Sequence, residues 1–460
     1  MGVFEIVRES LSGKSHDFTR GNLNRSIALL AIPMVIEMSM ESVFALCDVY
    51  FVSRLGTSSV AAIGIVEGLI TLVYALGIGL AVATTATVAR RIGEGDPEKA
   101  ARAAVQSNWL ALGAGAALGL GAVIFSSELL ELMGADALVV EIGDTYATIL
   151  LGSQTVILLL FVNNAAFRGA GDASLAMRCL MLANAINLVL DPCLIFGLGP
   201  FPELGLTGAA VATTIGRSVG VGYQFLTLYR ARGKLNITRE QLPPDTAQLV
   251  PLARLAIGGF AQHAVAMASW TMLVRIVAGF GNAALAGYTV AIRLIIFALL
   301  PSWGLSSAAA TLVGQSLGAK RSARAESVVW RIGAYNMVFL GSISLVFVTC
   351  SRALLAPFGI SDEAMAIGSD ALRIISYGFV FYAWELVLSQ AFNGAGDTQT
   401  PTRINLLCFW AFQIPFAYGL SRMPEYGVHA VFWIGALAYS VAATLALLLF
   451  RRGKWKQVSV

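Results

Sequence analysis

Long apolar runs follow one another through almost the whole chain. Each is about 20 to 30 residues long and ends at glycine, proline or charged residues, the pattern of helices that cross a bilayer. Only 13% of the residues are charged, against about 25% in soluble proteins, and 57% are apolar. The chain is therefore predicted to be an all-α integral membrane protein. The expected transmembrane helices cover residues 26–53, 60–90, 100–126, 138–165, 174–199, 205–229, 252–279, 284–316, 323–350, 366–393, 401–420 and 427–450.

A polar stretch from Arg230 to Pro251 separates these twelve spans into two groups of six. Lysines and arginines gather at the N-terminal end, in this stretch and in the tail, which places all three in the cytoplasm by the positive-inside rule. We therefore expect a multi-pass protein of the cell (inner or plasma) membrane with both termini cytoplasmic. The predicted parts are an N-terminal segment 1–25, a first lobe 26–230, a linker 231–250, a second lobe 251–452 and a tail 453–460.

The two halves repeat each other at an offset of about 225 residues. Residues 166–172 read AFRGAGD and residues 391–397 read AFNGAGD. The same offset pairs Gly79 with Gly304 and Gly93 with Gly318. Since each copy holds an even number of spans, we expect two pseudo-symmetric six-helix bundles related by an axis along the membrane normal. The cleft between them is the natural place for a substrate.

Three carboxylates, Glu37, Glu41 and Asp48, interrupt the first apolar span. At about 100° per residue, the three lie on one face of the helix. An ionised carboxylate costs up to about 3 kcal/mol in the middle of a membrane. A single acid of this kind is as often part of a structural network between helices. Three on one face favour a functional polar cavity.

The fifth span carries Asn184, Asn187 and Asp191 on one face, and Pro192 leaves a backbone carbonyl free beside Asp191. These oxygens suit a hard cation, and two close carboxylates could instead share a proton. Asn184 could equally join two helices, and Thr213 could bond to its own helix. The candidate coupling site contains Asp48, Tyr146, Asn187, Asp191 and Thr213, together with Glu37 and Glu41; a Na⁺ site would use Asp48, Asn187, Asp191 and Thr213.

The second lobe lacks this set of acids. At the position that the offset pairs with Glu37, for example, it has Gln262. It offers aromatic and methionine side chains suited to adaptable apolar binding, and the carboxylate of Glu385 for a cation. A single histidine such as His263 is more often a hydrogen-bonded core residue. The candidate substrate cavity contains Asn164, Asn184, Gln262, His263, Met267, Trp270 and Glu385. The expected partners of the acids, with the pairing left open, are Arg217, Arg275, Arg293 and Arg373.

Other function classes find no support in the sequence. The loop at residues 93–98 has neither a G-x-G-x-x-G nor a Walker spacing, so we expect no nucleotide. Hydrolase motifs and Cys/His clusters are missing, so we expect neither an enzyme nor a cofactor. The net charge of +4 is too small to indicate nucleic acid binding. The expected partners are small-molecule substrates and the lipid bilayer, and we expect a monomer.

Taken together, these motifs resemble the multidrug and toxic compound extrusion (MATE) transporters. The resemblance covers nearly the whole chain and rests on the AFRGAGD turn at 166–172, on Asn187 to Pro192, and on the GAAVAT run at 208–213. It implies a V-shaped pair of lobes that alternates between inward-open and outward-open forms and exchanges Na⁺ or H⁺ for organic compounds. Asp48, Tyr146, Asn187, Asp191 and Thr213 match the branch whose cation site is in the first lobe.

Within that branch, Pro33 matches a proline on which the first helix bends when the site is protonated, so Pro33 and Pro192 are the expected hinges. Glu37 and Glu41 are additional to the pattern of the branch. The resemblance implies export of drugs, toxins or other small, often cationic compounds, with H⁺ or Na⁺ as coupling ion. The alternative is a lipid-linked precursor flippase of the same superfamily, which would need a strongly cationic cavity.

Overall fold

The computed structural model describes residues 3–13, 16–230 and 233–458, without the side chains of residues 3, 45, 46, 48, 49, 53, 57, 58 and 60. The first half contains α1 (Val3–Leu11), α2 (Leu23–Ser53), α3 (Thr57–Gly93), α4 (Pro97–Ile124), α5 (Ser126–Leu132), α6 (Ala137–Gly152), α7 (Gln154–Ala170), α8 (Ala173–Phe196) and α9 (Gly205–Tyr229). The second half contains η1 (Arg239–Gln241), α10 (Thr246–Ala278), α11 (Asn282–Gly318), α12 (Ser322–Leu355), η2 (Ala356–Phe358), α13 (Asp362–Tyr377), α14 (Phe379–Ala395), α15 (Gln399–Asn405), η3 (Leu406–Gln413), α16 (Ile414–Ser421), α17 (His429–Arg451) and η4 (Lys454–Gln457).

These helices confirm the predicted all-α membrane fold. Among the described residues, ten helical stretches are long and apolar enough to cross a membrane, and the pair α13 and α14, bent by 55°, raises the count to eleven. The remaining predicted span is α9, 25 residues long, which packs along α8. The predicted fourth span consists of α6 and α7, and the eleventh of α15, the π-helical η3 and α16.

The largest difference from a predicted boundary is at the start of the seventh span. α10 begins at Thr246, inside the stretch expected to be a linker, because Asp245 caps it by accepting the backbone N–H of Ala247 at 3.0 Å. The predicted limits of the lobes and the tail otherwise remain predictions. Both expected hinge prolines lie inside continuous helices, Pro33 in α2 and Pro192 in α8.

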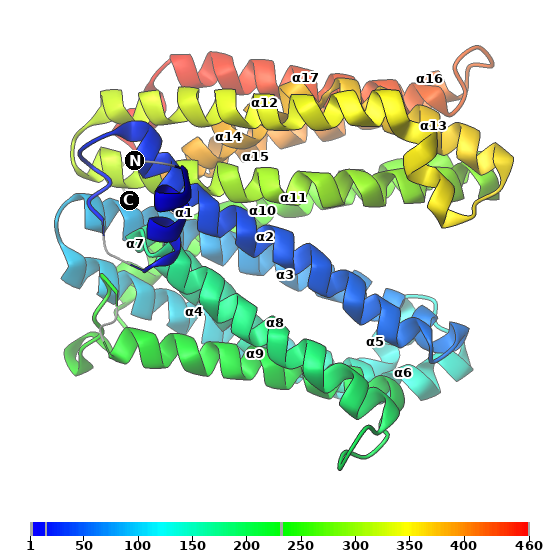
Figure 1. Ribbon diagram of the computed structural model, residues 1–460, viewed down its shortest axis with the longest axis horizontal. Coiled ribbons are helices and arrows are strands. Elements are labelled where there is room, and N and C mark those ends of the chain that lie inside the picture. Colours follow the sequence, from blue (N-terminus) through cyan, green and yellow to red (C-terminus); the bar gives the residue numbers. More distant parts are fainter. Residues whose placement is uncertain (1–2, 14–15, 231–232, 459–460) are drawn as a thin grey trace.

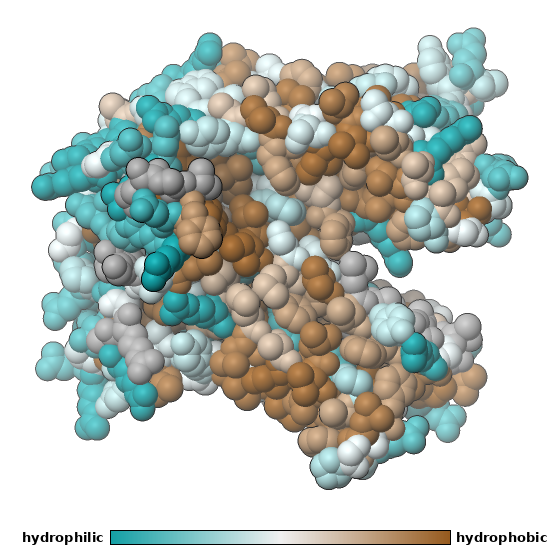
Figure 2. Space-filling view, in the orientation of Figure 1, coloured by the Kyte–Doolittle hydropathy of each residue, from teal (hydrophilic) through white to brown (hydrophobic). Residues whose placement is uncertain are grey.

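The helices form two bundles that meet at one end of the molecule and diverge at the other (Figure 1). Both chain termini lie at the end where the bundles meet, which we call the closed end. The opposite end, with α5 and the turn between α16 and α17, is the open end. The space-filling view shows a deep hollow between the bundles there (Figure 2). The molecule therefore has the V shape expected from the resemblance, with the V open at one end only.

Glycines allow the two lobes to touch along their backbones, and they do so in a symmetric way. A Cβ on Gly79 of α3 would lie 2.5 Å from the Ala256 carbonyl oxygen of α10. A Cβ on Gly304 of α11 would lie 2.6 Å from the Met34 carbonyl oxygen of α2. Real Cβ atoms do not approach so closely, so no other residue fits at these positions without movement. The predicted repeat thus sets both contacts between the lobes.

A second symmetric pair of glycines lies at the closed end. A Cβ on Gly93 of α3 would overlap the Gln315 backbone of α11, and a Cβ on Gly318 of α11 would overlap the Arg90 carbonyl oxygen of α3. The two helices therefore cross in backbone contact. Since neither glycine has a positive φ, it is the close approach that requires them.

The segment at residues 16–22 lies across the closed end and contacts both lobes. Lys234 donates hydrogen bonds from its ammonium to the His16 carbonyl and from its backbone N–H to the Asp172 carboxylate, the latter at 2.7 Å. Burial raises the pKa of Asp172, and this N–H bond opposes the rise. From the second lobe, Arg324 of α12 donates three hydrogen bonds of 3.0–3.1 Å to backbone carbonyls of the segment. The segment therefore ties the lobes together.

Arg324→Gln is expected to loosen this tie. The substitution removes three charge-assisted hydrogen bonds to the segment and one of 3.2 Å to Ser26, so we expect it to lower the free energy of unfolding by about 1–3 kcal/mol. Thermal unfolding of the purified protein would measure the change. Arg321→Gln is the matched control, because Arg321 donates a single bond of 3.0 Å to Thr19. An equal loss in both variants would contradict the role assigned to Arg324.

Candidate functional site

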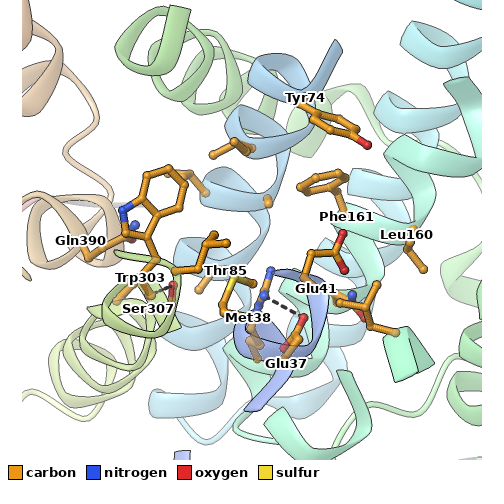
Figure 3. A pocket seen from close by; sticks show the side chains of 18 of the residues that line it. Glu37, Met38, Glu41, Tyr74, Thr85, Leu160, Phe161, Trp303, Ser307 and Gln390 are labelled. Carbon is orange, nitrogen blue, oxygen red and sulfur yellow. Dashed lines mark hydrogen bonds and ion pairs between the residues drawn. The ribbon is translucent and has the colours of Figure 1, made fainter. Parts of the chain in front are cut away.

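A cavity of about 280 Å³ lies where the two lobes meet (Figure 3). Most of its wall belongs to the first lobe, and α10, α11 and α14 of the second lobe close it. The indole of Trp303 and the ring of Phe161 stand on opposite sides of it. The polar lining consists of Glu37, Glu41, Tyr74, Thr85, Asn164, Arg168, Asn184, Arg217, His263, Ser307, Thr311, Gln390 and Asn393. Such a mixture of aromatic walls and few charged groups is typical of small-molecule sites.

The acidic face of α2 reaches this cavity. Glu37 and Glu41 are one helical turn apart and both line it, on the same face of α2 as predicted. Asp48 also lies in α2, but its side chain is outside the described part of the structure.

Glu37 forms a buried ion pair with Arg168 of α7. The Arg168 guanidinium donates to Glu37 Oε1 at 3.2 Å, and the two side chains are 15% and 1% exposed. The other oxygen of Glu37, Oε2, is buried without a hydrogen-bond partner among the described atoms. Thr311 of α11 donates to the Arg168 carbonyl at 3.1 Å and so joins this pair to the second lobe. The pair largely neutralises the charge of Glu37.

Glu41 has a different environment. The Asn184 amide of α8 donates to Glu41 Oε2 at 3.0 Å, and no ion pair to Glu41 is found among the described side chains. The side chain is half-buried and points into the cavity beside Phe161 (Figure 3). Of the two carboxylates, Glu41 is the one whose charge the surrounding described groups leave available.

The predicted polar face of α8 is present. The Asn187 amide donates to Asp191 Oδ1 at 3.0 Å and to Thr213 Oγ1 of α9 at 3.1 Å. Asp191 is 1% exposed. The Asn187 amide therefore bridges the Asp191 carboxylate and the Thr213 hydroxyl through its N–H groups. Binding of Na⁺ would require the amide to turn its oxygen inward.

Tyr146 of α6 is 6% exposed and packs in an apolar cluster with Leu206, Ala209 and Ala210 of α9. It therefore lies near the helix that carries Thr213. Asn187 is hydrogen-bonded to both Asp191 and Thr213. The side chain of Asp48 lies outside the described part of the structure, so whether it joins these three residues stays a prediction.

The predicted substrate residues divide between two places. Asn164, Asn184 and His263 line the cavity. The other four, Gln262, Met267, Trp270 and Glu385, are not part of its lining. Gln262 is 5% exposed, and its backbone carbonyl accepts the Asn405 amide of α15 at 3.1 Å. It does not share the direction of the neighbouring His263, because adjacent residues of a helix point about 100° apart.

Trp270 is 44% exposed, and Met267 is half-buried outside the lining. Glu385 is 7% exposed within the second lobe, where it accepts the Ser389 hydroxyl at 2.8 Å. His263 lines the cavity with its ring, and its Nδ1 lies 2.9 Å from the carbonyl of Gly259 in its own helix.

Sequence reasoning missed several cavity residues. In the sequence Arg168 stands out only as part of the repeated turn, whereas in the structure it pairs with Glu37. The repeat was the available signal for Arg168, because the offset pairs this residue with Asn393 in the second copy of the turn. Both residues line the cavity in the structure. Of the four arginines expected to pair with acids, Arg217 donates to the Tyr74 hydroxyl at 2.9 Å. The aromatic residues Tyr74, Phe161 and Trp303 also line the cavity, and no motif in the sequence predicts that they do.

Comparison with known proteins places this architecture among transporters. The family model MatE matches residues 33–193 and 261–419. The chain is 25% identical to a probable multidrug resistance protein, NorM, of Thermotoga maritima, over 95% of this chain and 94% of that protein.

Two solved structures show the same fold. One is a transporter of the MOP superfamily from Pyrococcus furiosus, described as having a binding pocket of reverse polarity, with 26% identity, a TM-score of 0.89, and coverage of 97% of this chain and 100% of the other. The other is an outward-facing multidrug resistance MATE transporter of the same superfamily, with 26% identity, a TM-score of 0.89 and the same coverage.

Proposed function

Because this chain belongs to the MatE family of membrane transporters, we propose that it exports small, often cationic organic compounds across the cell membrane in exchange for H⁺ or Na⁺. The relative named as a multidrug resistance protein supports this substrate range. Transporters of this kind are not enzymes. The proposed activity is an exchange in which the organic compound and the coupling ion are carried in opposite directions by one protein.

One observation carries the proposal: a single face of α8 links the cavity to the candidate coupling site. Asn184 bonds to Glu41 in the cavity, and Asn187, one turn further along, bonds to Asp191 and Thr213. A change in charge at Asp191 therefore has a short path to the group that faces the substrate. Coupling between two ligands needs such a shared element with two arrangements.

The mechanism follows from the open form described here. A cation that enters from the open end neutralises Asp191 and, on our proposal, Asp48. α2 then bends at Pro33 and the cavity shrinks, so that the substrate leaves outward. Release of the cation on the opposite side recharges the carboxylates and reopens the inner face. We assign the closed end, with both termini and most of the basic residues, to the cytoplasm. We expect the working unit to be a monomer.

A lipid-linked precursor flippase is less well supported. A pyrophosphate head group would need an excess of cationic side chains. In the cavity described here the two arginines of the lining, Arg168 and Arg217, are balanced by the two carboxylates Glu37 and Glu41, and Arg168 is already paired with Glu37.

Asp191→Asn is expected to abolish gradient-driven export. The substitution keeps the shape of the side chain but removes the charge that a coupling ion would neutralise. The measurement is efflux of a fluorescent organic cation from proteoliposomes under an imposed Na⁺ or H⁺ gradient. Asp362→Asn is the control, because Asp362 is exposed in the first turn of α13.

The gradient that drives efflux identifies the coupling ion. Efflux that ignores both gradients, or that survives in Asp191→Asn, would reject Asp191 as a coupling residue and renew interest in the flippase alternative.

A further inference from the structure

A groove separate from the central cavity runs along the outside of α2. It lies between α1, α2, α11 and α12 and has a volume of about 640 Å³. Its apolar part is lined by Ala28 and Ala31 of α2, Leu305 of α11 and Tyr335 of α12. Tyr335 is 44% exposed, so this part of the groove is open to the surroundings of the helices. In a membrane those surroundings are lipid.

The groove becomes polar toward the closed end. Asn22, Asn24 and Arg25 line it there, at the start of α2. At 1.5 Å per residue, Arg25 and Ala31 are about 9 Å apart along the helix axis. The start of α2 is also the start of its apolar span, so the polar part lies at the level of lipid head groups. The groove thus has the polarity of a phospholipid, with a head at one end and a chain along the other.

The polar end carries an excess of positive charge. Arg25 is 46% exposed and pairs with Glu9 of α1 at 2.6 Å. Arg331 of α12 is exposed and donates to the Asn24 side chain at 2.6 Å. Two guanidinium groups therefore accompany one carboxylate at this end. Guanidinium groups bind phosphate oxygens well, since they can donate two parallel hydrogen bonds.

The groove also spans both lobes. α2 belongs to the first lobe, and α11 and α12 belong to the second. The backbone contact of Gly304 with α2 lies beside it, because Leu305 lines the groove directly after Gly304. A molecule held here would touch both lobes near the closed end and would favour the form in which they are together.

We propose that this groove is a binding site for one anionic phospholipid, with its phosphate at Arg25 and Arg331 and an acyl chain along Ala28, Ala31, Leu305 and Tyr335. The bound lipid holds α2 against α11 and α12 and so stabilises the form that is open only at the open end. The site is independent of the transported compound.

The test uses the full-length protein in detergent, titrated with a short-chain phosphatidylglycerol and, separately, with the phosphatidylcholine of the same chain length. Thermal unfolding reports binding. We expect phosphatidylglycerol to raise the melting temperature more than phosphatidylcholine does, and added salt to reduce the difference. In Arg25→Gln/Arg331→Gln the apparent affinity for phosphatidylglycerol should fall by about tenfold, the effect of losing two partly exposed charge contacts.

Two further variants keep the result interpretable. Ala28→Phe fills the apolar part of the groove without removing a charge, and it should also suppress the response. Arg102→Gln changes an exposed arginine of α4 away from the groove and should leave the response intact.

Equal responses to the two lipids, an unchanged response in Ala28→Phe, or equal losses in Arg102→Gln would overturn the proposal. So would a dimer, detected by light scattering, that persists with either lipid and is lost in Ala28→Phe. In that case a second copy of the chain would occupy the groove.

Discussion

Gly93→Val is expected to prevent the two lobes from closing and to stop transport. The new side chain would overlap the Gln315 backbone of α11, and a helix backbone cannot move aside as a side chain can. α3 and α11 would have to separate at the closed end. An overlap of about 1–3 kcal/mol shifts the balance between two conformations by roughly 5- to 150-fold.

The separation can be measured with spin labels at Lys99 and Ser327, which are exposed on α4 and α12 near the closed end. We expect longer label-to-label distances in Gly93→Val, together with loss of export in proteoliposomes. By the symmetry of the repeat, Gly318→Val should reproduce the effect, because its Cβ would overlap the Arg90 carbonyl oxygen.

The matched control is Gly113→Val in α4. It also places valine in a transmembrane helix, but nothing lies within 4 Å of the added Cβ. Unaltered distances and full export in Gly93→Val would show that the crossing of α3 and α11 does not control closure.

The second large effect concerns the buried ion pair of Glu37 and Arg168 in the wall of the cavity. Arg168→Gln should destabilise the protein by about 3–5 kcal/mol, because it leaves Glu37, 1% exposed, as an unpaired buried charge. The double substitution Glu37→Gln/Arg168→Gln removes both charges and should recover most of that loss. Unfolding by heat or denaturant of the four proteins in one cycle gives the coupling free energy.

A coupling free energy near zero would contradict the pairing. Glu41→Gln provides the comparison, since the partner of Glu41 is the neutral amide of Asn184. We expect it to change stability little and to weaken the binding of cationic compounds, because it removes the carboxylate that lacks a charged partner among the described side chains.

Much of the fold could be read from local rules. Apolar runs of about 20 residues predict the spans, because a bilayer core has a fixed thickness and each backbone group in it must be bonded within its helix. The period of 3.6 residues placed Glu37 and Glu41 on one face of α2 and Asn184, Asn187 and Asp191 on one face of α8. The repeat pairs Gly79 with Gly304 and Gly93 with Gly318, and the structure shows that both pairs lie at backbone contacts between the lobes.

These local rules do not predict which side chains of different helices contact each other. Which side chains share a face of a helix can be predicted from residue spacing, since that depends only on helix geometry. The packing of the helices is what brings Arg168 to Glu37 and Asn184 to Glu41, and what buries Gln262 and Glu385 outside the cavity lining. Partners of this kind lie far apart in the chain, and their distance depends on how α2, α7, α8 and α10 pack, which no local pattern records.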